Sequence, residues 1–200
     1  MTTLIHEGIE FILPGIYKAY PREWAEQLIH EGTLYFTALE SFQRDEHPER
    51  GDSLEGTAIV IREGQRCTIG SLNPIFVCCF TMETDRECIL TTWNDRDTVV
   101  QICNTLKFAE RILDYVETNE MLLRIQVGPV AYDKDEGSYR EPFRGESTFQ
   151  KNLRFSGQKE FRFALVGFTN MRSKYEEFLA NGEHLILKLG DCSDIMRIVE

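Results

Sequence analysis

The sequence has few basic residues for its acidic content, and it has no long apolar run. Its 22 Lys and Arg stand against 33 Asp and Glu, which gives a formal net charge of -11. That balance argues against non-specific binding to nucleic-acid phosphates, because such binding needs a basic surface. The longest apolar runs are far shorter than the roughly 20 residues that a membrane-spanning helix needs. We therefore expect a soluble protein with no membrane partner.

Paired metal-binding cysteines are also missing. The six cysteines are Cys67, Cys78, Cys79, Cys88, Cys103 and Cys192. They form no CxxC pair, and none stands at a zinc-binding distance from a histidine. Most lie in apolar runs such as IFVCCF, where a free cysteine behaves as a small hydrophobic residue. With no signal peptide in view, these features predict a reducing, cytoplasmic environment and no bound metal.

Signatures of the common catalytic sites do not occur. There is no P-loop, no GxSxG, no HExxH and no GxGxxG that opens a helix. The four histidines (His6, His30, His47 and His184) are scattered, so nothing marks a Cys–His or His–Asp pair. Asp95 and Asp97 in DRD could hold a divalent cation, but solvated carboxylates are the usual state in loops this acidic.

The remaining pattern predicts one α+β domain over residues 1–200, with a mixed or mainly antiparallel sheet and a few flanking helices. We expect helices at 21–32, with Trp24 and Leu28 on one face, and at 104–119 and 173–182. Strands are expected at 9–20 (broken at Pro14), 33–39, 75–81, 88–93, 122–132, 157–167 and 184–189, with a hairpin at 56–70. Polar loops are expected at 40–56 and 133–147, and the segment 191–200 is ambiguous.

The stretch GQKEFRFALVG (157–167) carries an unusual set of polar residues. In a strand, Gln158, Glu160 and Arg162 would share one face. Phe161, Phe163 and Leu165 would share the other and enter the core. The polar face would either meet solvent, as a surface ion pair worth at most about 1 kcal/mol, or line a pocket.

The order of several short motifs resembles an uncharacterised bacterial and phage domain family. The motifs are GIYKAY, TLYFTALESFQRD, IFVCCFT, TTWND, VAY and FQKNLRFSGQKEFRF, spread over residues 15–165. Two positions depart from that family's pattern. Gln43-Arg44-Asp45 stands where the family has Asn-Asp, and Trp93 lacks the Tyr that follows it in the family.

The layout is similar, more distantly, to ADP-ribosyltransferases. Gln158-Lys159-Glu160 matches the late Gln-x-Glu element of those enzymes, at the start of a strand and after a long loop. Such enzymes break the nicotinamide–ribose bond of NAD through an oxocarbenium-like state, which a carboxylate stabilises. The resemblance implies an ADP-ribosyltransferase-like fold, with Glu160 as that carboxylate and Gln158 orienting the nucleophile.

The same resemblance implies an NAD site around these two catalytic residues. The resemblance assigns stacking on the nicotinamide ring to Tyr17 or Tyr35. It gives the pairing with the pyrophosphate to Arg44, Lys18 or Arg162, because guanidinium and ammonium groups bind phosphate oxygens.

Two functions follow as predictions. The first is an NAD-dependent ADP-ribosyltransferase-like enzyme that modifies a macromolecular target, as a toxin or effector in phage–bacterium conflict. The locally basic stretch 140–162 admits a nucleic-acid target. The second is a non-catalytic, acidic interaction protein that inhibits or sequesters a host or phage partner.

Overall fold

The computed structural model describes residues 2–6, 9–45, 51–53, 55–62, 65–71, 73–134, 147–182 and 184–200. The contacts within the chain divide it into two compact units. Unit 1 comprises residues 1–35, 79–121 and 186–200, and unit 2 comprises 36–78 and 122–185. The α+β class with a mainly antiparallel sheet is confirmed, while the single domain over 1–200 stays a prediction.

The sheet of unit 1 is built around β3 (Ile16–Tyr20). This strand pairs antiparallel with β8 (Thr98–Ile102) on one side and with the end of β7 (Ile75–Thr81) on the other. Strand β8 also pairs antiparallel with β14 (Met196–Val199), which gives a structure to the ambiguous C-terminal segment. A separate antiparallel pair forms from β1 (Thr2–His6) and β2 (Ile9–Leu13), so the chain is broken at Pro14 as predicted.

Two helices of unit 1 begin and end where the sequence predicts. Helix α1 (Arg22–Glu31) follows Pro21 and ends at Gly32, whose φ of 62° suits a residue without a side chain. Helix α3 (Thr105–Thr118) begins at Asn104, whose side chain accepts a hydrogen bond from the Lys107 N–H. Each helix buries residues at spacings of three and four, as an amphipathic helix should.

The strand predicted at 88–93 is wrong, because residues 88–92 belong to helix α2 (Arg86–Thr92) and Trp93 is its C-cap. The side chain of Asp85 accepts hydrogen bonds from the N–H groups of Glu87 and Cys88. This N-cap satisfies N–H donors that the first turn of a helix leaves without an intrahelical partner. The cap therefore favours a helix and outweighs the strand preference of the β-branched and apolar residues in CILTTW.

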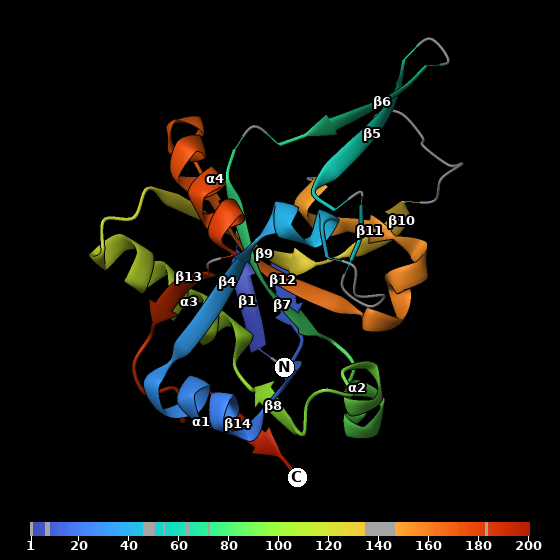
Figure 1. Ribbon diagram of the computed structural model, residues 1–200. Helices are drawn as coiled ribbons and strands as arrows, with labels where there is room; N and C mark the ends of the chain where they lie inside the picture. The colour runs from blue at the N-terminus through green and yellow to red at the C-terminus, as the bar shows by residue number, and fades with distance from the viewer. Residues whose placement is uncertain are drawn as a thin grey trace. The chain divides into compact units, whose positions relative to one another are not determined.

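Unit 2 has β12 (Glu160–Gly167) at its centre, and all eight residues of this strand are buried. It pairs antiparallel with β9 (Leu123–Pro129) and also pairs with β7. The end of β4 (Thr33–Ala38) pairs antiparallel with β7. Phe161 and Phe163 are 1% and 0% exposed, so their predicted place in the core is confirmed. Figure 1 shows β9 and β12 lying side by side.

The other strands of unit 2 form two short pairs. The predicted hairpin is confirmed as β5 (Thr57–Arg62) antiparallel to β6 (Gln65–Gly70), drawn at the upper right of Figure 1. Strands β10 (Ala131–Lys134) and β11 (Gln150–Asn152) pair in parallel. The strand predicted at 122–132 is divided in the structure, because β9 ends at Pro129 and β10 begins at Ala131.

Short helices connect these strands. They are η1 (Leu39–Gln43), η2 (Ser147–Phe149), η3 (Leu153–Gln158) and η4 (Thr169–Met171), with α4 (Arg172–Asn181) leading to β13 (His184–Lys188). The predicted loop at 40–56 therefore starts as a 3-10 helix, and its residues 46–50 lie outside the described residues. Most of the loop predicted at 133–147 lies outside them too. Within the described ranges, no helix is long and apolar enough to cross a membrane.

Candidate functional site

The polar residues of GQKEFRFALVG are not aligned on one strand. Gln158 is the last residue of η3, Lys159 has a φ of 44°, and β12 begins only at Glu160. The predicted alternation over Gln158 and Glu160 is therefore wrong, because a left-handed residue separates them. The two side chains still meet, since the Lys151 Nζ lies 2.9 Å from Gln158 Oε1 and 3.1 Å from Glu160 Oε2.

Arg162 joins this group to a second carboxylate. Its Nε donates to Glu160 Oε1 at 2.5 Å, and its Nη2 donates to Glu160 Oε2 at 3.2 Å. Its Nη1 and Nη2 donate to the two oxygens of Glu55 at 2.8 and 3.0 Å. The Nη1 also donates to the carbonyl oxygen of Thr148 at 2.6 Å. We call Glu55, Lys151, Gln158, Glu160 and Arg162 the buried ion cluster.

The cluster is closed to solvent and balanced in charge. The exposed fraction is 1% for Glu55 and Arg162, and 4% to 7% for the other members. Two carboxylates face one guanidinium and one ammonium group, so the formal charges cancel. A buried charge is costly unless it is paired and hydrogen-bonded, and both oxygens of Glu160 accept such bonds. The polar face is therefore buried, and the surface ion pair considered from the sequence is wrong.

The backbone fixes the cluster at the start of β12. The N–H of Glu160 donates to the Tyr132 hydroxyl at 2.7 Å, and its carbonyl accepts from the Val130 N–H at 2.9 Å. The Lys151 ammonium group lies 4.7 Å from the centre of the Phe155 ring. These contacts connect β10, β11 and η3 to the first residue of β12, so local packing fixes the positions of the charged groups.

Three of the predicted NAD-binding residues lie in unit 1. The Tyr17 hydroxyl accepts a hydrogen bond from Gln101 Nε2 at 2.8 Å. The Lys18 Nζ lies 5.4 Å from the centre of the Phe80 ring. Tyr35 is 37% exposed.

The other predicted residues lie in unit 2. Arg44 is exposed and directly follows η1, where its N–H donates to the Ser41 carbonyl. Gln158, Glu160 and Arg162 belong to the buried ion cluster. The structure thus brings these three together, and Arg162 donates to the carboxylates of Glu55 and Glu160.

Sequence reasoning missed Glu55 and gave Lys151 no partner. Glu55 is separated by 107 positions from Arg162 and stands in a segment read as a polar loop. No local pattern marks such a contact. Lys151 occurs in the motif FQKNLRF that the family resemblance rests on, which was the one available signal.

A second notable group is an exposed aromatic surface in unit 1. Trp24 is 44% exposed and Tyr35 is 37% exposed, and their rings stack with centres 6.2 Å apart. The Arg96 guanidinium lies 5.6 Å from the centre of the Trp24 ring. Trp24 lies four residues before Leu28 and so on the same side of α1, but it is exposed, whereas Ala25, Leu28 and Ile29 are buried. We call Trp24, Tyr35 and Arg96 the aromatic surface.

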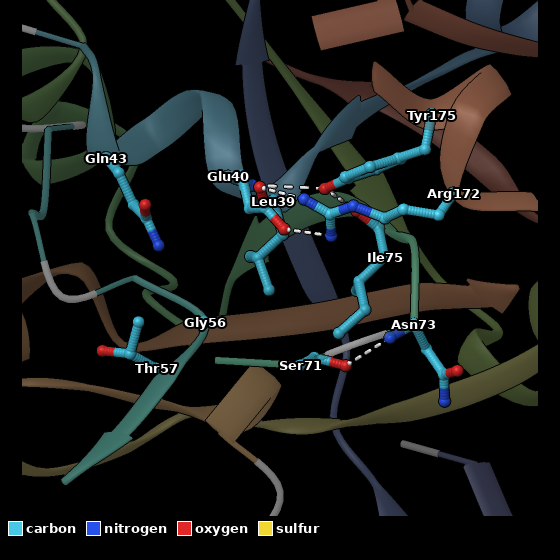
Figure 2. A pocket seen from close by; sticks show the side chains of 10 residues that line it. All are labelled: Leu39, Glu40, Gln43, Gly56, Thr57, Ser71, Asn73, Ile75, Arg172 and Tyr175. Atoms are coloured by element: carbon cyan, nitrogen blue, oxygen red, sulfur yellow. Dashed lines mark hydrogen bonds and ion pairs between the residues drawn. The ribbon is translucent and has the colours of Figure 1, made fainter. Parts of the chain in front are cut away.

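Unit 2 also contains a pocket of about 540 Å³. Its walls come from η1, α4, the first residues of β5 and β7 and the segment between β6 and β7. It is lined by Leu39, Glu40, Gln43, Gly56, Thr57, Ser71, Asn73, Ile75, Arg172 and Tyr175. Figure 2 shows Arg172 and Tyr175 reaching toward Glu40. The Arg172 Nη1 and Nη2 lie 2.7 and 3.0 Å from the two Glu40 oxygens.

The pKa values of Arg172 and Tyr175, which line this pocket, are both raised. The hydrogen bonds that Arg172 donates to Glu40 raise the pKa of Arg172, and its ion pair with Glu176 at 2.6 Å adds to this effect. Burial raises the pKa of Tyr175 to about 12. The Tyr175 hydroxyl donates to the Ile75 carbonyl at 3.1 Å and accepts from the Glu40 N–H at 3.4 Å. Hydrogen bonds therefore hold the Arg172–Glu40 ion pair and the Tyr175 phenol in place as one wall of the pocket.

Across the residues that the structure describes, no group of three or more His, Cys, Asp or Glu is arranged to hold a metal ion. Comparisons with protein-family models, with curated proteins and with solved structures find no match to this chain.

Proposed function

We propose that the protein is a non-catalytic binding protein that takes a basic protein partner on the aromatic surface of unit 1. The stacked, exposed pair of Trp24 and Tyr35 carries this proposal. Trp, Tyr and Arg are the residues most enriched at the energetic centres of protein interfaces, and Arg96 supplies the third. An exposed tryptophan beside an exposed tyrosine loses apolar contact with water when a partner covers it.

The charge around the aromatic surface favours a basic partner. Helix α1 exposes Glu23 and Glu31, and the carboxylate of Asp95 lies beside Arg96 at 3.3 Å. The whole chain has a formal net charge of -11. Complementary charge speeds association and selects among partners. The exposed aromatic faces also attract Lys and Arg side chains through cation–π contacts.

The enzymatic prediction stays an alternative. NAD-dependent ADP-ribosyl transfer requires a carboxylate that can stabilise positive charge developing on the ribose. In the buried ion cluster, the charge of Glu160 is already balanced by Arg162 and Lys151. This engagement of Glu160 is the reason we favour binding over NAD turnover.

A fluorescently labelled peptide of alternating lysine and leucine tests the binding proposal, with fluorescence anisotropy as the measurement. The wild type is expected to bind it, and Trp24→Ala to weaken the affinity about tenfold or more, as at a typical interface centre. Added salt should weaken binding in both proteins, because it screens the acidic side chains.

Leu113→Ala is the matched control, since Leu113 is a 38% exposed apolar residue of α3 in the same unit. It should leave the affinity within a factor of two or so of wild type. Equal affinities for Trp24→Ala and Leu113→Ala would contradict the proposal, as would the absence of binding by the wild type.

A further inference from the structure

We propose that the pocket of unit 2 is a binding site for a neutral, polyhydroxylated small molecule such as a mono- or disaccharide. The site is separate from the aromatic surface of unit 1, and it does not depend on the function proposed there. Its volume of about 540 Å³ is within the range of small-molecule sites, about 300–1,000 Å³.

The pocket offers amide groups that can bind hydroxyls. Asn73 lines it, and within the described part of the chain only the Asn73 backbone makes a hydrogen bond, from its N–H to Ser71 Oγ at 3.1 Å. The Asn73 carboxamide therefore keeps both a donor and an acceptor for a ligand. The amide nitrogen of Gln43 donates to the Glu55 carbonyl at 2.7 Å, which turns the Gln43 oxygen into an acceptor of fixed orientation. Figure 2 shows these two amides on opposite sides of the pocket.

The charges of the wall disfavour an anionic ligand. Arg172, the cation of the lining, already binds the carboxylates of Glu40 and Glu176. These three groups sum to one negative formal charge, so a phosphate or carboxylate would face net repulsion. A hydroxyl group, in contrast, can donate to the remaining lone pairs of Glu40, whose side chain is 27% exposed.

The aromatic residue of the lining does not offer a stacking face. Tyr175 is 2% exposed, and its ring packs edge-on against Phe76 with centres 5.1 Å apart. A planar base gains much of its binding energy by stacking on such a face. Among the described residues of the lining, the walls offer hydrogen-bonding groups but no free ring and no free cation, which fits a sugar better than a nucleotide.

Saturation-transfer NMR with two matched pairs of probes tests the site. The pairs are glucose with glucose 6-phosphate, and trehalose with trehalose 6-phosphate. We expect at least one neutral sugar to bind, and its phosphorylated counterpart to bind more weakly. Asn73→Ala should weaken the sugar about fivefold or more, because it removes a donor and an acceptor.

Asn170→Ala is the control, since Asn170 is an exposed amide of η4 in the same unit and is not part of the lining. It should leave sugar binding unchanged. Circular dichroism confirms that both variants fold. The proposal is overturned if neither sugar binds the wild type, if the phosphorylated probes bind as well as the neutral ones, or if the two asparagine variants have the same affinity.

Discussion

At the scale of single residues, the central feature is that Arg162 bridges two carboxylates in the interior of unit 2. Its guanidinium pairs with both oxygens of Glu55 and both oxygens of Glu160. Bidentate pairs of this kind give geometric specificity, which a lysine would not supply. Such a pair is costly to break, because the remaining charge has no water to replace its partner.

Replacing Arg162 should therefore lower stability strongly. We expect Arg162→Met to reduce the free energy of unfolding by about 3–5 kcal/mol, since it leaves two buried carboxylates facing Lys151 alone. Urea denaturation followed by circular dichroism measures the loss. Arg172→Met is the comparison, because the Arg172 side chain is 35% exposed and its pairs are worth only about 1 kcal/mol. Equal losses for the two variants would show that the cluster is not a structural centre.

Sequence reasoning selected Glu160 and Arg162 but not their surroundings. Their identity and proximity along the chain were visible, whereas their burial depends on Glu55, more than a hundred positions away. A period-two pattern also predicts a polar face wherever polar residues alternate. The pattern cannot distinguish a solvated face from an internal ion cluster, because both have the same alternation of polar residues in the sequence.

At the scale of elements, local hydrogen bonding determines where the helices begin. Asn104 caps α3, which begins where the amphipathic run at 104–119 predicts a helix. Asp85 plays the same part for α2, but the residues after it, with two threonines and a tryptophan, favoured a strand. Element type could be predicted where the cap and the apolar period agree. The predicted element type was wrong where they conflict, over residues 88–92 of α2.

The cap of α3 provides a test at this scale. Asn104→Ala should lower the free energy of unfolding by about 1 kcal/mol, because the Lys107 N–H loses its acceptor. The thermal unfolding midpoint is the measurement. Asn94→Ala serves as the control, since Asn94 is exposed and lies outside the described helices of unit 1, and its effect should stay within about 0.5 kcal/mol. A midpoint for Asn104→Ala no lower than that of the control would contradict the capping role.

At the scale of the whole molecule, the α+β class followed from runs of strand-like segments with few helices between them, and the structure confirms it. The division of contacts into two units could not be predicted, because no change of composition or linker marks it and each unit draws on separate parts of the chain. The acidic balance of the chain was visible at once. The proposal that this acidic charge attracts a basic partner depends on the exposure of Trp24 and Tyr35, which the sequence did not show.

The central claim is that this protein binds a protein partner and does not turn over NAD. An assay with labelled NAD tests this claim most directly. The wild-type protein is incubated with NAD labelled on its adenylate part, together with cell extract, and both label transfer and nicotinamide release are measured. We predict neither transfer nor release above the level of a sample without the protein, because Glu160 is held by Arg162 and Lys151. Transfer of label to a macromolecule by the wild type, abolished in a folded Glu160→Gln variant, would contradict the account.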